Sequence, residues 1–119
     1  CFLMNAQDLA TAKKYGASPI FIVINNGIYG SIRMHQERAF PTRSIGTDLD
    51  NPDFVAFAEA FGVNGFRVTK TAEFENIFEE AVAKPGPCLI ELVVSEEAIS
   101  PAFTLSELIE RSLKAQAEK

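Results

Sequence analysis

The longest uninterrupted apolar segment of the chain covers residues 19–24, where Pro-Ile-Phe-Ile-Val-Ile contains no polar position. β-Branched and aromatic residues without polar alternation are typical of a strand that is buried on both faces of a parallel sheet. The segment therefore predicts a central strand. It ends on Asn25 and Asn26, and the glycines Gly27 and Gly30 follow before helix-compatible sequence resumes.

Helical spacing on both sides of this strand predicts a helix before it and another after it. Ala and Leu residues between Gln7 and Tyr15 recur at helical intervals. Asn5 is the expected N-cap of this first helix and Gly16 its C-terminal stop. After the glycines, residues 31–38 predict a second helix with mixed apolar and charged positions.

Two later helices are predicted from stripes of apolar side chains. The first opens at Asn51-Pro52, with proline in its first turn and Asp53 near the positive end of the helix dipole, and Gly62 ends it. The second covers residues 72–83, with Thr71 as the expected N-cap. The stripes are Phe54, Phe57, Ala58 and Phe61 in one helix, and Phe74, Ile77, Phe78, Ala81 and Val82 in the other. Stripes of this spacing face a core, so both helices are expected to pack on the sheet.

Two further segments predict strands. Residues 66–68 predict a short outer strand, and residues 88–94 predict the last strand, after Pro85-Gly86-Pro87 breaks the preceding helix. Glu91 interrupts this last apolar run, so we expect it near one end of the strand or at the sheet edge. Cys88 is expected to be a small core residue.

A C-terminal helix is predicted over residues 104–118. Thr104 and Glu107 have the spacing of a capping box. The alternation of strands and helices, with no internal repeat, predicts a single domain over residues 1–119 with an α/β three-layer sandwich and a mostly parallel sheet.

Composition and charge limit the partners of this domain. The net charge is −5, and no run of basic residues is present to neutralise a nucleic-acid backbone. No apolar run reaches the roughly twenty residues that span a membrane, and no leader resembles a signal peptide. We therefore expect a cytoplasmic protein that binds neither nucleic acid nor membrane. The two cysteines have neither a disulfide-framework pattern nor a zinc-site spacing.

The turn from Asn25 to Ser31 follows the carboxyl end of the predicted strand, where open parallel sheets bind their ligands. Amide and carbonyl oxygens are hard ligands that suit Mg²⁺ or Ca²⁺, and N–H groups at a helix start suit phosphate. Asn and Gly also tolerate positive φ, and on pattern alone these residues are more typical of a plain turn. From the residues alone, both interpretations stay open.

Three segments of the chain resemble the thiamine-diphosphate-binding domain of the acetolactate synthase and benzoylformate decarboxylase superfamily. They are Phe2-Leu3-Met4-Asn5, Gln7-Asp8-Leu9-Ala10-Thr11-Ala12 and Asn25-Asn26-Gly27-Ile28-Tyr29-Gly30-Ser31-Ile32-Arg33. Members of that superfamily carry Gly-Asp-Gly, a spacer and then an Asn pair. The resemblance implies that Cys1 directly follows a missing Gly-Asp-Gly. It also implies that the chain is a fragment, truncated at its N-terminus, whose fold lacks its first strand.

The same resemblance assigns roles to individual residues. It implies that Asn26 binds Mg²⁺ through its side chain and that Ile28 binds the same ion through its backbone carbonyl. The positions that match contacts to the diphosphate of thiamine diphosphate are Cys1, Tyr29, Gly30 and Ser31. These residues hold the cofactors, and no residue of this chain is expected to be catalytic.

The function implied by the resemblance is part of a 2-oxo acid decarboxylase or carboligase, a lyase or transferase similar to acetolactate synthase. In that family the glutamate that activates the cofactor comes from a different domain, usually of a partner subunit. We therefore expect a homo-oligomer with a 2-oxo acid substrate, and an inactive isolated fragment. A non-catalytic binding or assembly module and a flavodoxin-like nucleotide binder stay open as alternatives.

Three side chains on the helix after the turn are weaker candidates for substrate contacts. His35 falls where the resembled enzymes line the substrate pocket, but it is equally placed to be a solvated helix residue. Arg33 and Arg38 can pair with a carboxylate or a phosphate, although a surface pair with Glu37 explains them as well. Residues 39–50 have no clear period and predict a long loop that crosses the mouth of the site.

Overall fold

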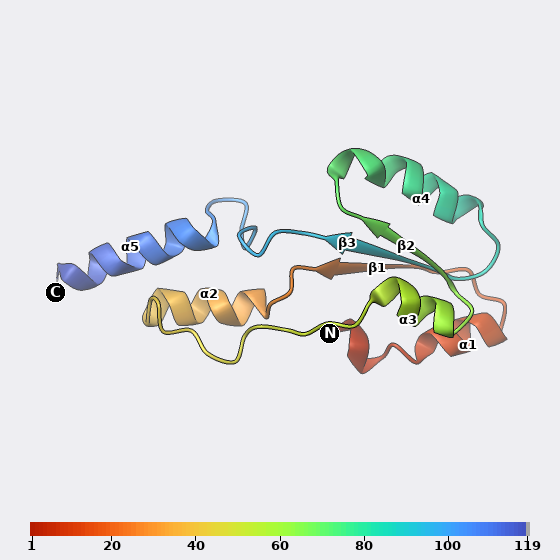
Figure 1. Cartoon of the computed structure of the whole chain (residues 1–119), viewed down its shortest axis with the longest axis horizontal. Helices are drawn as coiled ribbons and strands as arrows, with labels where there is room; N and C mark the ends of the chain where they lie inside the picture. The colour runs from red at the N-terminus through yellow and green to blue at the C-terminus, as the bar shows by residue number, and fades with distance from the viewer. Residues whose placement is uncertain (119) are drawn as a thin grey trace. The chain divides into compact units, whose positions relative to one another are not determined.

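The computed structural model describes residues 1–118, which form two compact units (Figure 1). Unit 1 consists of Cys1–Asn25 and Asn51–Val93, and unit 2 consists of Asn26–Asp50 and the segment from Val94 onward. Whether residues 1–119 form a single domain, as the sequence predicts, stays untested by this division into units.

Unit 1 is built on a parallel sheet of three strands. In chain order they are β1 (Ile20–Asn25), β2 (Asn64–Val68) and β3 (Cys88–Val93). The strand order is β1-β3-β2, so that β3 lies between the other two (Figure 1). Cys88 of β3 pairs with Ile20 on one side and with Asn64 on the other. Because all pairs are parallel, the carboxyl ends of the strands meet at one edge, where Asn25 pairs with Val93.

The prediction that residues 19–24 form a central strand is wrong for the sheet of residues 1–118. β1 is an edge strand there, and β3 is the central one. Val23 is only 7% exposed, whereas Ile22 and Ile24 on the opposite face are 46% and 69% exposed. The apolar pattern correctly indicates a strand with two apolar faces, but it carries no information about which strands lie beside it.

Helices cover both faces of the sheet, which confirms the three-layer α/β sandwich (Figure 1). On one face, α1 (Asp8–Lys14) and α3 (Phe54–Ala60) pack in a first core. On the other face, α4 (Phe74–Ala83) packs in a second core. The buried members are Leu9, Val23, Phe54, Ala58, Val63 and Leu89 in the first core, and Val68, Ala81, Cys88 and Ile90 in the second. β3 supplies side chains to both cores because successive residues of a strand point to opposite faces.

The start of α3 differs from the prediction by a small shift with a clear cause. Asp53 is the N-cap of α3, and its carboxylate accepts hydrogen bonds of 3.0 Å from the backbone N–H groups of Val55 and Ala56. Pro52 therefore lies before the helix rather than in its first turn. Gly62 ends the helix as predicted, with φ at +67°.

Two other predicted N-caps are wrong because short 3-10 turns precede the helices. Asn5 follows the 3-10 helix η1 (Phe2–Met4) as its C-cap, and α1 begins only at Asp8. Thr71 is the first residue of the 3-10 helix η2 (Thr71–Glu73), which leads directly into α4. The sequence signals the polar side chain in both cases but not the tighter turn.

The predicted buried stripe of α4 is correct for three of its members and wrong for two. Ala81 is 2% exposed, and Phe74 and Ile77 pack against the second core. Phe78 and Val82 are instead 36% and 61% exposed. Together with neighbouring side chains of α4, they line an open groove of about 600 Å³.

Unit 2 contains α2 (Gly30–Ala39) and α5 (Leu105–Ala117), which pack against each other. The capping box predicted for the C-terminal helix is present. Thr104 N–H donates to Glu107 Oε2 at 2.9 Å, and Glu107 N–H donates to Thr104 Oγ1 at 3.2 Å. Residues 40–50, which follow α2, contain no helix and only an isolated bridge, as the predicted loop requires.

Within residues 1–118, the helices lack the length and apolarity that crossing a membrane requires. The same residues contain no group of three or more His, Cys, Asp and Glu side chains arranged to hold a metal ion. A site built on an amide oxygen and a backbone carbonyl is of a different kind, and the turn before α2 has both.

Candidate functional site

The turn Asn26–Tyr29 is paired with the returning loop of unit 2. An isolated antiparallel bridge joins Ile28 to Asp48, and a backbone hydrogen bond of 2.8 Å lies on either side of it. These bonds run from Tyr29 N–H to the Thr47 carbonyl and from Leu49 N–H to the Gly27 carbonyl. The loop predicted over residues 39–50 therefore lies alongside the turn and fixes its backbone.

This bridge determines where the Ile28 carbonyl points. When the flanking residues of an antiparallel pair make the hydrogen bonds, the N–H and C=O groups of the paired residues point away from each other. The Ile28 N–H accordingly donates to Asn26 Oδ1 at 3.2 Å, on the side away from Asp48. The carbonyl of an extended residue points to the same side as its N–H. Two neutral oxygens, Asn26 Oδ1 and the Ile28 carbonyl, therefore face the same side of the turn.

Two glycines give this turn its shape. Gly27 has a φ of +69°, a conformation that side-chain-bearing residues rarely adopt. A Cβ atom at Gly30 would lie 3.0 Å from Asn26 Nδ2. The Asn26 amide thus occupies the place that a side chain at Gly30 would fill, so the Asn26 side chain lies at the start of α2.

Within residues 1–118, the N-terminus of α2 presents backbone donors that lie outside the helical hydrogen-bond ladder. The first intrahelical bond runs from Arg33 N–H to the Tyr29 carbonyl at 2.9 Å, so the N–H groups of Gly30, Ser31 and Ile32 precede the helical ladder. The N-cap residue Tyr29 makes no side-chain capping bond within the described chain, and its side chain is 49% exposed. Such donors at the positive end of a helix dipole are a common binding site for phosphate.

The structure brings five of the six predicted site residues together. Asn26, Ile28, Tyr29, Gly30 and Ser31 occupy one continuous turn and helix start in unit 2. Cys1, the sixth, is exposed and belongs to unit 1. These five residues lie close together in space because they are neighbours along the chain.

The charged residues of α2 are engaged differently from the prediction. The Arg33 guanidinium bonds to the Thr47 hydroxyl and forms an ion pair of 2.5 Å with Asp48 Oδ1. Glu37 is 3% exposed, and its carboxylate accepts a hydrogen bond of 2.6 Å from the Thr42 N–H. The predicted surface pairing of the arginines with Glu37 is therefore wrong for Arg33, which instead fastens the returning loop to the helix.

Two other side chains of α2 lie toward solvent. His35 is exposed, as expected of a solvated helix residue. Arg38 is also exposed and lines, with Arg111 of α5, a hollow of about 330 Å³. A substrate contact through His35 stays a prediction.

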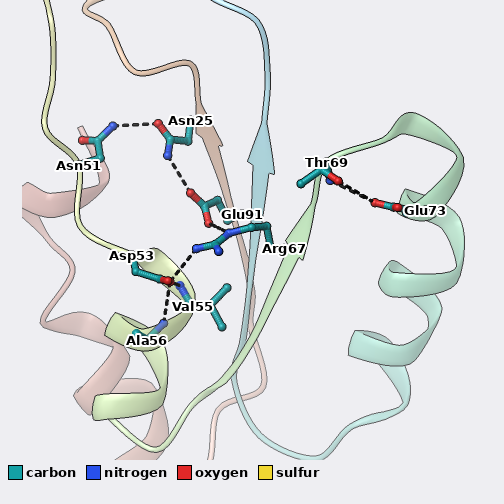
Figure 2. A network of polar contacts seen from close by, with 9 residues as sticks. All are labelled: Asn25, Asn51, Asp53, Val55, Ala56, Arg67, Thr69, Glu73 and Glu91. Atoms are coloured by element: carbon teal, nitrogen blue, oxygen red, sulfur yellow. Dashed lines mark hydrogen bonds and ion pairs between the residues drawn. The ribbon is translucent and has the colours of Figure 1, made fainter.

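A polar network centred on the buried Glu91 lies in unit 1, and sequence reasoning missed it (Figure 2). Glu91 is 2% exposed and sits within the central strand β3, paired with Val23 on one side and Arg67 on the other. The prediction that Glu91 lies near a strand end or at the sheet edge is therefore wrong. Its carboxylate accepts hydrogen bonds of 2.7 Å from Arg67 Nε and from Asn25 Nδ2. The sequence signal was an acidic residue in an apolar strand with an arginine in the neighbouring strand.

The network continues in both directions from Glu91. Asn25 Oδ1 accepts a bond of 2.9 Å from Asn51 Nδ2, and Arg67 Nη2 donates to Asp53 Oδ1 at 2.7 Å (Figure 2). The bonds to Glu91 and Asp53 raise the pKa of the Arg67 guanidinium. The backbone N–H of Ala56 and then the Arg67 guanidinium hold the pKa of Asp53 below its ordinary value. The chain of contacts thus runs from the end of β1 to the N-cap of α3.

Comparison with known proteins decides the family. Residues 1–92, which include the turn, α2 and all of this network, match the family described as thiamine pyrophosphate enzyme, C-terminal TPP binding domain. This chain belongs to that family. Thiamine pyrophosphate (TPP) is thiamine diphosphate, so the family predicted from residues 2–33 and its cofactor are confirmed.

Several relatives are named as enzymes. The large subunit of acetolactate synthase isozyme 2 from Escherichia coli (strain K12) is 30% identical over 116 residues, covering 92% of this chain and 21% of that protein. Acetolactate synthase large subunit from Cyanidium caldarium is 32% identical over 96 residues, which cover 79% of this chain and 16% of that protein. Pyruvate oxidase from Lactiplantibacillus plantarum is 34% identical over 104 residues, which cover 86% of this chain and 17% of that protein. This chain therefore spans about a fifth or less of the length of these relatives.

Proposed function

We propose that this chain is the Mg²⁺- and diphosphate-binding part of a thiamine-diphosphate-dependent enzyme that acts on 2-oxo acids, similar to acetolactate synthase. The observation that carries the proposal is the turn Asn26–Tyr29, which joins two neutral oxygens on one side to free N–H groups at the start of α2. The names of the relatives support a 2-oxo acid as the substrate class, since pyruvate is one.

The donor atoms of the turn fit Mg²⁺. This ion takes an octahedral shell of oxygens and usually shares it between a few protein ligands, phosphate and water. Asn26 Oδ1 accepts one bond from the Ile28 N–H and keeps a second lone pair for a metal. The Ile28 carbonyl faces the same side. Neither oxygen carries a charge, so an anionic group such as a diphosphate would help to hold the ion here.

The start of α2 fits the diphosphate. The N–H groups of Gly30 and Ser31 and the exposed side chains of Tyr29 and Ser31 offer donors at the positive end of the helix. We also assign Cys1 to the diphosphate contacts. When bound, thiamine diphosphate would supply the nucleophilic carbon for a 2-oxo acid, and its thiazolium ring would take up the electron pair released with CO₂. The residues of this chain bind and orient the cofactor.

The remainder of the site is proposed to come from other parts of the protein. We expect a second domain or subunit to supply the glutamate that activates the cofactor, within a cytoplasmic homo-oligomer. We also expect residues 1–119 to be inactive when isolated. The lyase or transferase reaction therefore belongs to the full protein rather than to this part of it.

Titration calorimetry of the full protein with thiamine diphosphate, at increasing Mg²⁺ concentration, tests the proposal. Asn26→Ala should raise the Mg²⁺ concentration for half-maximal cofactor binding by more than about tenfold, since even the loss of an outer partner of a metal ligand costs 10–100-fold. Asn76→Ala is the matched control, because Asn76 is an exposed amide on α4. Cofactor binding without any Mg²⁺ dependence would contradict the proposal. No binding at all would favour a non-catalytic assembly module.

A further inference from the structure

Glu91 is an unusual residue for its position. Its side chain is 3% exposed, and the preceding three residues of β3, Cys88, Leu89 and Ile90, are fully buried. Replacing a buried ion pair by well-packed apolar residues is often neutral or stabilising, so stability alone does not explain a carboxylate here. The contacts of Glu91 indicate a different role.

The two oxygens of Glu91 serve two different partners. Oε2 accepts from Arg67, whose side chain is 41% exposed, and Oε1 accepts from Asn25 Nδ2. A carboxylate can only accept hydrogen bonds, so the Asn25 amide has to turn its Nδ2 toward Glu91 and its Oδ1 toward Asn51. Figure 2 shows the Asn25 side chain held between these two neighbours. The amide therefore has a single orientation, with both ends bonded.

Asn25 is the last residue of β1 and directly precedes Asn26. Its backbone pairs with Val93, and its side chain bonds to Glu91 and Asn51. The residue before the proposed metal ligand is thus fixed by three separate contacts within unit 1. On the C-terminal side of Asn26, the Ile28 N–H donates a hydrogen bond to Asn26 Oδ1.

We infer that Glu91 is a positioning residue for the Mg²⁺ site. Through its bond to Asn25, the Glu91 carboxylate fixes the strand end from which Asn26 reaches the metal. The inference rests on the proposed function of Asn26 as a metal ligand. Outer partners of metal ligands typically change metal affinity by about 10–100-fold, and Glu91 acts through one further residue, so we expect the lower end of that range.

The test measures the Mg²⁺ concentration for half-maximal binding of thiamine diphosphate to the full protein, together with the free energy of unfolding. Glutamine keeps one acceptor oxygen, which the charged Arg67 guanidinium would take, and its NH₂ group would then face Asn25 Nδ2 without accepting from it. Glu91→Gln and Asn25→Ala should therefore each raise this concentration by about tenfold. The double variant should need no higher Mg²⁺ concentration than either single variant, because Glu91 acts through Asn25. Unchanged single variants, or effects that multiply in the double variant, would overturn the inference. If Glu91→Gln does not fold, Asn25→Ala removes the same bond from a half-buried strand end.

Arg67→Met is the matched control, since it removes the other bond to the same carboxylate and leaves the Asn25 bond in place. This variant should lower the free energy of unfolding but leave the Mg²⁺ requirement nearly unchanged. A Mg²⁺ requirement raised as far by Arg67→Met as by Glu91→Gln would assign Glu91 a general structural role and overturn the inference.

Asn26→Ala separates this inference from the proposed function. If Asn26→Ala leaves the Mg²⁺ requirement unchanged, the proposed function fails, and the positioning role fails with it. If Asn26→Ala raises the requirement while Glu91→Gln and Asn25→Ala do not, only the positioning role fails.

Discussion

Cys1 and Cys88 differ in the properties that control the reactivity of a thiol. Cys88 is fully buried, and its Sγ lies 3.5 Å from the Ala81 carbonyl. Burial raises the pKa of the Cys88 thiol, whereas Cys1 is exposed. Because the thiolate is the reactive form, iodoacetamide should modify Cys1 alone in the folded chain and both cysteines in denaturant. Mass spectrometry of the intact chain and of its peptides measures this, and rapid modification of Cys88 in the folded chain would contradict its burial.

The lowered pKa of Asp53 predicts a loss of folding stability in acid. Its pKa is held below the ordinary 3.8 by the backbone N–H of Ala56 and by the Arg67 guanidinium. A carboxyl group with a lower pKa in the folded state stabilises that state above its unfolded pKa, and this contribution is lost as the pH falls through the folded pKa. The free energy of unfolding should therefore decrease below about pH 4.

Asp53→Asn isolates this effect, because an amide retains the N-cap oxygen but does not titrate. Urea unfolding of both proteins across the acidic range measures the difference. The gap in stability between the natural chain and the variant should narrow as the pH falls. A gap that stays constant at every pH would show that the Asp53 carboxylate does not contribute through its charge.

At the scale of elements, α4 combines a covered and an uncovered apolar face. Ala81 is 2% exposed and its neighbour Val82 is 61% exposed. Ala81→Leu should cost about 1–3 kcal/mol of unfolding free energy, because added methylenes do not fit a packed core. Val82→Gln should change it by less than about 0.5 kcal/mol. Urea unfolding of the chain measures both, and equal costs would mean that the exposed face is in fact packed.

The elements themselves were largely predictable from sequence. The stripe of α3 and the strands β2 and β3 follow directly from the apolar pattern, because a buried face repeats along a single element. Helix starts were harder. Asn5 and Thr71 have the side chains of an N-cap, yet 3-10 turns occupy both places. Such turns depend on backbone geometry that no single residue type specifies.

The candidate site divides in the same way between local and distant contacts. One turn and helix start contain Asn26, Ile28, Tyr29, Gly30 and Ser31, because these residues are consecutive or nearly so in the sequence. Their roles in binding stay a prediction. The network around Glu91 was not predictable. It joins residues from β1, β2, β3 and the start of α3, and the periodicity of one strand carries no information about which side chain lies across from it on the next.

At the scale of the whole chain, the exposed edge of β1 has a consequence for behaviour in solution. β1 lies at the edge of the sheet of residues 1–118, and Ile22 and Ile24 on it are 46% and 69% exposed. Edge strands with apolar side chains pair readily with other chains, and large exposed apolar patches promote association. Residues 1–119 on their own should therefore self-associate, which sedimentation velocity over a range of protein concentrations measures.

Ile24→Lys should reduce this self-association, because a charged side chain on an edge strand opposes pairing with a second chain. Ile45→Lys is the matched control, since Ile45 is 81% exposed but lies in the loop of unit 2 rather than on a strand. Both variants add the same charge, so a difference between them reports on the strand and not on net charge. If the natural chain sediments as a monomer at every concentration, or if both variants act alike, the edge of β1 is not the surface through which the chain associates.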